Sequence, residues 1–190
     1  MATAAPDRLH LTGDDEADTL LAAEPFALLV GFALDQQVPV PTAFAGPLKL
    51  QRRLGTLDAG HIAATDPARL EEVFREKPAI HRFPASMARR VQDLGAHVVE
   101  CYDGDASRLW REATDGDDLR RRIEALPGFG EMKVKALGSV LAKRFGVEAA
   151  EGLVPDHPTL GDVDSAEALE WYQAEKRAYK AARRARAGTA

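Results

Sequence analysis

Apolar residues recur along the chain at the three- and four-residue spacing of amphipathic helices, and a proline or a capping residue precedes most of these stretches. The helices before residue 147 are expected to begin near Pro25, Thr42, Asp66, Pro84, Leu119 and Glu131. Pro47 is expected to kink or split the second of them. A last helix follows Asp164, which with Glu167 has the spacing of a capping box. No stretch alternates apolar and polar residues as a β-strand does, so we predict an all-α fold.

Composition narrows the class of protein. The chain has 190 residues, of which 45% are apolar, enough to build a core. Its single cysteine, Cys101, excludes an internal disulfide and a four-cysteine zinc or iron–sulfur site. The histidines show no metal-ligand spacing, so we expect no metal and no cofactor. No apolar run approaches the roughly 18 residues of a membrane span, and no export signal is visible. We expect a soluble, cytoplasmic protein that does not bind membranes.

Charge is distributed unevenly along the chain. The net charge of −5 argues against binding nucleic acid through overall electrostatics. Acidic residues gather near the beginning, at Asp14, Asp15, Glu16, Asp18 and Glu24. Basic residues gather in 175–190, at Lys176, Arg177, Lys180, Arg183, Arg184 and Arg186. This asymmetry leaves room for a local DNA-binding face, to which the basic last helix would add nonspecific phosphate affinity.

The most informative segment is Leu126-Pro127-Gly128-Phe129-Gly130, between two amphipathic helices. Its glycines allow a tight turn that brings backbone N–H groups to the surface at a helix N-terminus, where an anion such as a phosphate is favoured. A plain corner between two helices is the alternative interpretation. The leading Leu-Pro and the following helix favour a hairpin that packs behind and presents its loop outward.

This segment resembles the Leu-Pro-Gly-hydrophobic-Gly hairpin of the helix-hairpin-helix DNA glycosylases, the base-excision repair family of endonuclease III, 3-methyladenine glycosylase and 8-oxoguanine glycosylase. Residues 28–38 are similar to that family's early helix, and residues 83–105 to the helix that closes with a Tyr-x-Gly turn. The resemblance covers roughly residues 25 to 146 in the family's order. It implies a two-lobed helical fold in which 27–130 forms a central lobe ending in the hairpin, and 1–26 plus 131–190 form the second lobe.

The resemblance also implies DNA-binding residues. The amides of Gly128 and Gly130 would bind the phosphate backbone beside a lesion, and Lys133 would add a phosphate contact. Alternatively, Lys133 and Lys135 are a solvated helix face. Gln37 matches the position that fills the gap left by an extruded base, since such an enzyme flips its target out of the duplex. The alternative for Gln37 is a helix cap.

The catalytic residues are less well matched. The family places an aspartate after the hairpin's second helix, and Asp156 is the leading candidate, with Asp162 and Asp164 as rivals. The alternative for Asp156 is a residue of an Asx turn. Where bifunctional members have a lysine, this chain has Met132. Lys133 lies one position along, about 100° around the helix, and we expect it to point away from the pocket. We therefore expect no AP-lyase chemistry.

The resulting hypothesis is a monomeric, monofunctional DNA N-glycosylase that hydrolyses the N-glycosidic bond of a damaged base in double-stranded DNA, associated with the nucleoid in a bacterium. The alternative is a non-catalytic helix-hairpin-helix DNA-binding module that has lost the catalytic aspartate. A third possibility is a helical protein-interaction domain.

Four aromatic residues could stack on a flipped base, but apolar helix stripes favour core packing for all of them: Phe83, Trp110, Trp171 and Tyr172.

Overall fold

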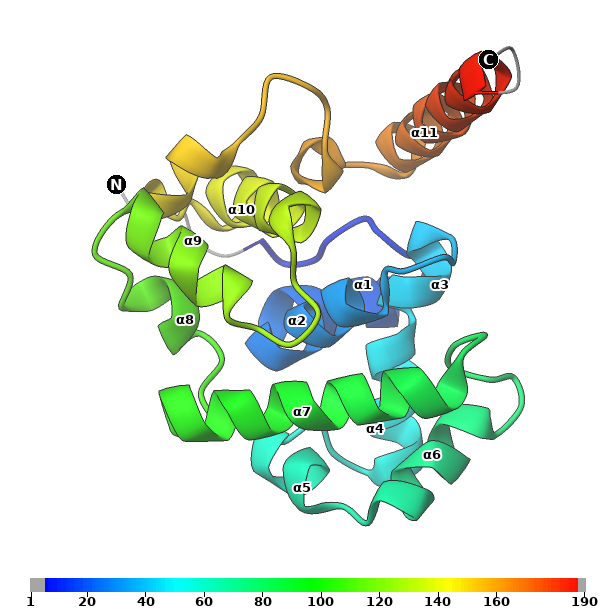
Figure 1. The fold of residues 1–190 in the computed structure, drawn as a ribbon, viewed down its shortest axis with the longest axis vertical. Coiled ribbons are helices and arrows are strands. Elements are labelled where there is room, and N and C mark those ends of the chain that lie inside the picture. Colours follow the sequence, from blue (N-terminus) through cyan, green and yellow to red (C-terminus); the bar gives the residue numbers. More distant parts are fainter. Residues whose placement is uncertain (1–5, 188–190) are drawn as a thin grey trace.

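The computed structural model describes residues 6–187, and every regular element within them is a helix (Figure 1). The prediction of an all-α fold is therefore confirmed. The α-helices are α1 (Asp15–Ala23), α2 (Pro25–Leu34), α3 (Val40–Phe44), α4 (Gly46–Leu54), α5 (Ala59–Ala64), α6 (Pro67–Arg75), α7 (Pro84–Tyr102), α8 (Arg108–Arg111), α9 (Gly116–Glu124), α10 (Glu131–Phe145) and α11 (Ala166–Ala187). Two 3₁₀ turns, η1 (Glu148–Leu153) and η2 (Leu160–Asp162), lie between α10 and α11.

Helix α2 is the centre of the fold. Its sequence, PFALLVGFAL, is apolar on every side, and all of it after Pro25 is buried. A helix without a polar face must be covered all round. Helices α1, α3, α4 and α7 pack against it, and Gly31 allows a close approach by the ring of Phe44. The two ends of α2 are consequently held in fixed positions.

Short polar residues and prolines set the helix boundaries, as the sequence suggests. Aspartate side chains accept hydrogen bonds from backbone N–H groups at the beginnings of α1, α5, α6 and α9. These N-cap residues are Asp14, Asp58, Asp66 and Asp115. The predicted break at Pro47 is confirmed, because α3 ends at Phe44 and Pro47 lies in the first turn of α4. The predicted cap of the last helix is wrong. Ser165, not Asp164, accepts the N–H of Ala168 at the start of α11 (3.1 Å).

Glycines allow several elements to pack closely. A Cβ on Gly95 of α7 would lie 2.8 Å from the carbonyl oxygen of Ala59, so α7 and α5 are in direct contact. Similarly, Gly161 of η2 lies against the backbone of Ser139, and Gly138 lies against Leu153. Segment 147–164 thus contains the two 3₁₀ turns η1 and η2, which pack on α10.

A continuous apolar core joins residues from Leu9 to Leu169. Helix α1 packs against α2 and α4, so it adjoins the segment 27–130. Residues 1–5 and 188–190 of the expected second lobe lie outside the described residues. Within the described chain, no single helix is long and apolar enough to cross a membrane; only α1 and α2 together pass that test, as a pair bent by 115°.

Candidate nucleic-acid interface

The turn between α9 and α10 has the geometry of an anchored hairpin. Leu126 and Phe129 are buried, and the N–H of Phe129 donates to the carbonyl oxygen of Leu126 (3.1 Å). Between them Gly128 has a φ of 79°, in the left-handed region that favours glycine. Gly128 and Gly130 are exposed. The two apolar residues thus hold the loop while the glycine backbone faces outward.

The N-terminus of α10 has no side-chain cap, unlike the aspartate-capped helices. Gly130 is its N-cap residue, and a Cβ there would meet nothing within 4 Å. The first N–H groups of a helix have no partner within the helix and carry partial positive charge. The acidic first-turn residue, Glu131, is paired with Arg120 (2.7 Å) and Lys135 (3.2 Å). Lys135 thus fits the solvated helix face that we considered as an alternative.

Arg90 of α7 connects this hairpin to the end of α2. A Cβ on Gly128 would lie 2.7 Å from Arg90 Nε, so the arginine side chain rests directly on the glycine. The same guanidinium donates a hydrogen bond to Oε1 of Gln36, just beyond α2. In Figure 1 the loop between α9 and α10 lies against α2 and above α7. Arg90 therefore fixes the hairpin relative to the Gln36–Gln37 segment.

His81 also binds the Gln36–Gln37 segment, through the backbone of Gln36. The backbone N–H of Phe83 donates to Nδ1 (3.1 Å), so Nε2 carries the proton and donates to the carbonyl oxygen of Gln36 (3.0 Å). His81 is buried, and burial together with the charges of Arg82 and Arg90 lowers its pKa. The imidazole is therefore neutral in the folded protein at neutral pH.

This histidine should make stability depend on pH. A pKa lowered by folding gives stability that is complete above the unfolded value of about 6.5 and lost as pH falls below it. We expect the free energy of unfolding, measured in urea, to fall between pH 7.5 and 5.5. His81→Ala should cost about 1–3 kcal/mol at pH 7.5, for the unpaired Gln36 carbonyl, and show a smaller fall. An equal fall in both proteins would contradict this role.

Lys133 is turned toward the end of α2, so the alternative interpretation of a solvated helix face is wrong for it. Its Nζ lies 3.4 Å from the carbonyl oxygen of Ala33 and 5.1 Å from the centre of the Phe129 ring. Burial and the charge of Arg90 lower the pKa of Lys133 to about 8, and Asp35 opposes this shift. Lys133 therefore faces the end of α2, and it is not part of a solvated face.

Asp35, at the C-terminal end of α2, is the carboxylate that the fold brings to this region. Burial raises its pKa, and the charges of Lys176, Lys133 and Lys180 oppose that effect. Burial, together with the charges of Asp35 and Asp162, raises the pKa of Tyr172 of α11 to about 12. One lysine of the hairpin helix and two lysines of α11 thus act electrostatically on one partly buried acid.

The predicted aspartates lie elsewhere. Asp156 is exposed in the segment between η1 and η2, which in Figure 1 rises above α10, away from the hairpin loop. Asp162 closes a capping box with Thr159 and binds Lys143, and these bonds lower its pKa despite burial. Asp164 is exposed. Asp162 is thus held beside the last turn of α10, whereas the hairpin lies at the N-terminal end of that helix.

Gln37 is exposed, with a φ of 57°, beyond the end of α2. Asp35 occupies the helix cap position, so the capping interpretation of Gln37 is wrong.

Among the aromatic residues, Trp110 is buried, as expected for core packing. Trp171 and Phe83 are exposed, so core packing was the wrong interpretation for them. Tyr172 is partly buried beside the core.

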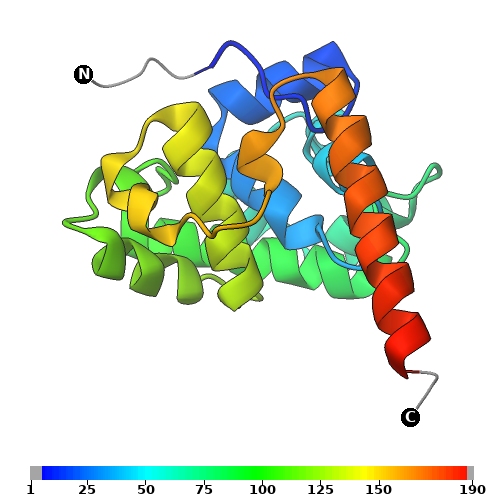
Figure 2. The same cartoon turned by 90° about the horizontal axis from the view of Figure 1, so that it is seen from above.

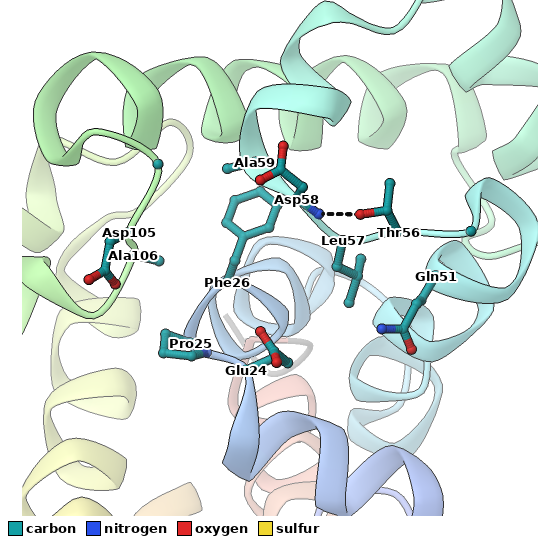
Figure 3. A pocket seen from close by; sticks show the side chains of 12 residues that line it. Glu24, Pro25, Phe26, Gln51, Thr56, Leu57, Asp58, Ala59, Asp105 and Ala106 are labelled. Atoms are coloured by element: carbon teal, nitrogen blue, oxygen red, sulfur yellow. Dashed lines mark hydrogen bonds between the residues drawn. The ribbon is translucent and has the colours of Figure 1, made fainter.

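A cavity of about 380 Å³ opens at the other end of α2 (Figure 3). Glu24, Asp58 and Asp105 are among its lining residues. Asp58 caps α5, and Asp105 accepts hydrogen bonds from Ser107, so two of these acids have structural roles. In residues 6–187 no group of three or more histidine, cysteine or acidic side chains is arranged to hold a metal ion. The α9–α10 hairpin, Arg90 and residues 35–37 form what we call the hairpin site. None of them lines the cavity, so the cavity is separate from this site.

Sequence reasoning missed Asp35, Arg90 and His81. In the sequence, Asp35 is only the polar residue that ends the apolar helix α2. Arg90 is only one of several charged residues in the amphipathic helix α7. A signal was present, because Asp35 directly precedes Gln36-Gln37 in the segment that carries the family resemblance. Comparison with models of known protein families, with characterised proteins and with solved structures found no match. The assignment of function therefore depends on the residues of the hairpin site.

Proposed function

We propose that this chain is a base-excision repair protein that binds double-stranded DNA through the α9–α10 hairpin and hydrolyses the N-glycosidic bond of a damaged base. The observation that carries the proposal is the exposed, uncapped glycine hairpin that Arg90 joins to the Gln36–Gln37 segment. A phosphate bound at the hairpin would accept hydrogen bonds from the backbone N–H groups of Gly128 and Gly130. Gln37 would then enter the base stack at a fixed distance from that phosphate.

Asp35 is better suited to the chemistry than Asp156, because it directly precedes Gln36, which Arg90 joins to the hairpin, and Lys133 contacts the carbonyl oxygen of Ala33 two residues before it. As the bond to the base breaks, positive charge develops on the deoxyribose. An ionised carboxylate stabilises that charge and accepts a proton from the attacking water. The products are an abasic sugar and the free base, which takes up that proton as it leaves. Lys133, Lys176 and Lys180 favour the ionised form of Asp35, and its burial disfavours that form.

Strand cleavage is a second candidate activity, favoured by the inward orientation of Lys133. An amine with a pKa of about 8 is roughly half neutral at pH 8, and a neutral amine can attack the sugar carbon in place of water. The resulting imine can be reduced to a stable covalent complex. Hydrolysis remains the proposed activity, because Met132 occupies the position of the family's lysine and Lys133 is in contact with Ala33 and Phe129.

The proposal is tested by single-turnover base release from duplexes that carry alkylated, oxidised or deaminated bases. We expect one class to be released without strand cleavage, and no covalent complex when borohydride is added. A borohydride-dependent complex that Lys133→Ala abolishes would assign the lyase activity instead. Duplex binding without release of any base would favour the non-catalytic binding module, and absence of duplex binding would exclude both.

A further inference from the structure

Helix α11 extends beyond the body of the protein. Leu169 is buried and Tyr172 and Lys176 are partly buried, whereas residues 177–186 are exposed. Figure 2 shows this helix, in orange and red, crossing one end of the molecule and projecting past its edge. More than two turns of the helix therefore have no covering element among the described residues.

The stripe of α11 that contacts the body continues into the exposed part. Tyr172, Lys176, Tyr179 and Arg183 follow one another at intervals of four, three and four residues, so they share one face. The burial of Leu169 and the partial burial of Tyr172 and Lys176 identify this face as the one turned toward the body of the protein. The charges of Lys176 and Lys180 act on Asp35 at the end of α2. In Figure 2 the outer part of α11 and the N-terminal end of α10 point toward the same side of the molecule, and in Figure 1 α11 lies above the loop between α9 and α10.

The charge of this face differs in sign from that of the whole protein. Residues 176–187 contain no acidic residue, while the chain as a whole carries a net charge of −5. The basic residues of this part are Lys176, Arg177, Lys180, Arg183, Arg184 and Arg186. Tyr179 is exposed between them. A long polyanion fits such a face better than a globular protein partner does, because consecutive phosphates match a row of basic side chains.

We propose that the face of α11 formed by Lys176, Tyr179, Lys180 and Arg183 binds the backbone of the same DNA duplex that the hairpin holds. This inference rests on the proposed function for its partner, duplex DNA. It adds a second contact surface, on α11, to the one at the hairpin. The charges of Lys176 and Lys180 act on Asp35 in the free protein, and in the complex they also lie near phosphates.

Two double variants of equal charge test the proposal. Lys180→Gln/Arg183→Gln removes two charges from the proposed face. Arg177→Gln/Arg184→Gln removes two exposed charges that, at about 100° per residue, lie about 100–160° around the helix from Tyr179 and Arg183 and about 40–60° from Lys180. Fluorescence anisotropy with an undamaged 20-base-pair duplex between 50 and 200 mM salt measures affinity. Circular dichroism checks that both variants stay helical.

Each phosphate contact contributes about 0.9 to the slope of log K against log salt, so the face variant should lower that slope by about 2. The control should change it by less than half as much. Equal effects of the two variants, or no effect of either, would overturn the proposal. Tighter binding to phosphatidylserine vesicles than to the duplex, lost in the face variant, would also overturn it.

A hairpin variant, Gly128→Ala, separates this inference from the proposed function. If it loses duplex binding while Lys180→Gln/Arg183→Gln does not, the hairpin function stands and the α11 surface is excluded. If only Lys180→Gln/Arg183→Gln loses binding, the α11 surface stands and the hairpin function fails. A wild-type protein that binds no duplex would exclude both.

Discussion

Asp35→Asn should reduce single-turnover base release by about 100- to 1,000-fold, the usual effect of removing one group that stabilises charge in a transition state. Asparagine has nearly the same shape but cannot carry the negative charge that stabilises the deoxyribose cation. The Kd for the duplex should stay the same or decrease, because Lys133, Lys176 and Lys180 no longer have a competing carboxylate. Quenched-flow measurement of release and anisotropy measurement of binding give the two quantities separately.

Asp156→Asn is the matched control, since Asp156 is exposed in a segment away from the hairpin. It should release the base at the wild-type rate. If Asp156→Asn abolished release and Asp35→Asn did not, the carboxylate suggested by the family resemblance would be the catalytic one. Segment 154–158 would then have to move toward the hairpin when DNA binds.

Gly128→Ala should weaken duplex binding by about tenfold or more, roughly 1.4 kcal/mol. The new Cβ would lie within 3 Å of the Arg90 side chain, so the guanidinium must shift on the glycine, and the shift changes the geometry of its bond to Gln36. The left-handed backbone adds a stability cost of about 1–2 kcal/mol for a residue with a Cβ. Anisotropy gives the affinity, and urea unfolding gives the stability.

Gly55→Ala provides a close control for this variant. Gly55 has the same φ of 79°, at the end of α4, and a Cβ there would meet nothing within 4 Å. Both variants should therefore lose a similar amount of stability, while only Gly128→Ala loses affinity. Equal losses of affinity in the two proteins would show that backbone strain, and not displacement of Arg90, weakens binding.

The helices were predictable because their signals are local. Pro25 and Pro84 occupy first-turn positions, Pro47 separates α3 from α4, and Gly128 and Gly130 form the turn that their spacing suggests. Helix α1 was missed, because its acidic residues were interpreted as a charge asymmetry. Asp18 among them is in fact buried and accepts the backbone N–H groups of Leu11 and Thr12 (both 3.0 Å).

The site was only partly predictable, because its contacts join distant parts of the chain. Helical periodicity indicates that Lys133 and Met132 differ by about 100° in direction, but it does not indicate which of them faces α2. The structure answers this, since Met132 is 86% exposed and Lys133 is turned inward. Similarly, no local pattern predicts that Lys176 of the last helix acts on Asp35.

The burial of α2 bears on how the protein would capture DNA. Amide hydrogens in a helix covered on all sides exchange with solvent only through large-scale opening, so the end that carries Asp35 belongs to the slowest-exchanging part of the molecule. Exposed backbone in the outer turns of α11 should exchange through local fraying. A duplex would then contact the flexible basic part of α11 first, and this flexibility increases the number of orientations in which an encounter leads to binding. The rigid end of α2 would fix the position of the duplex afterwards.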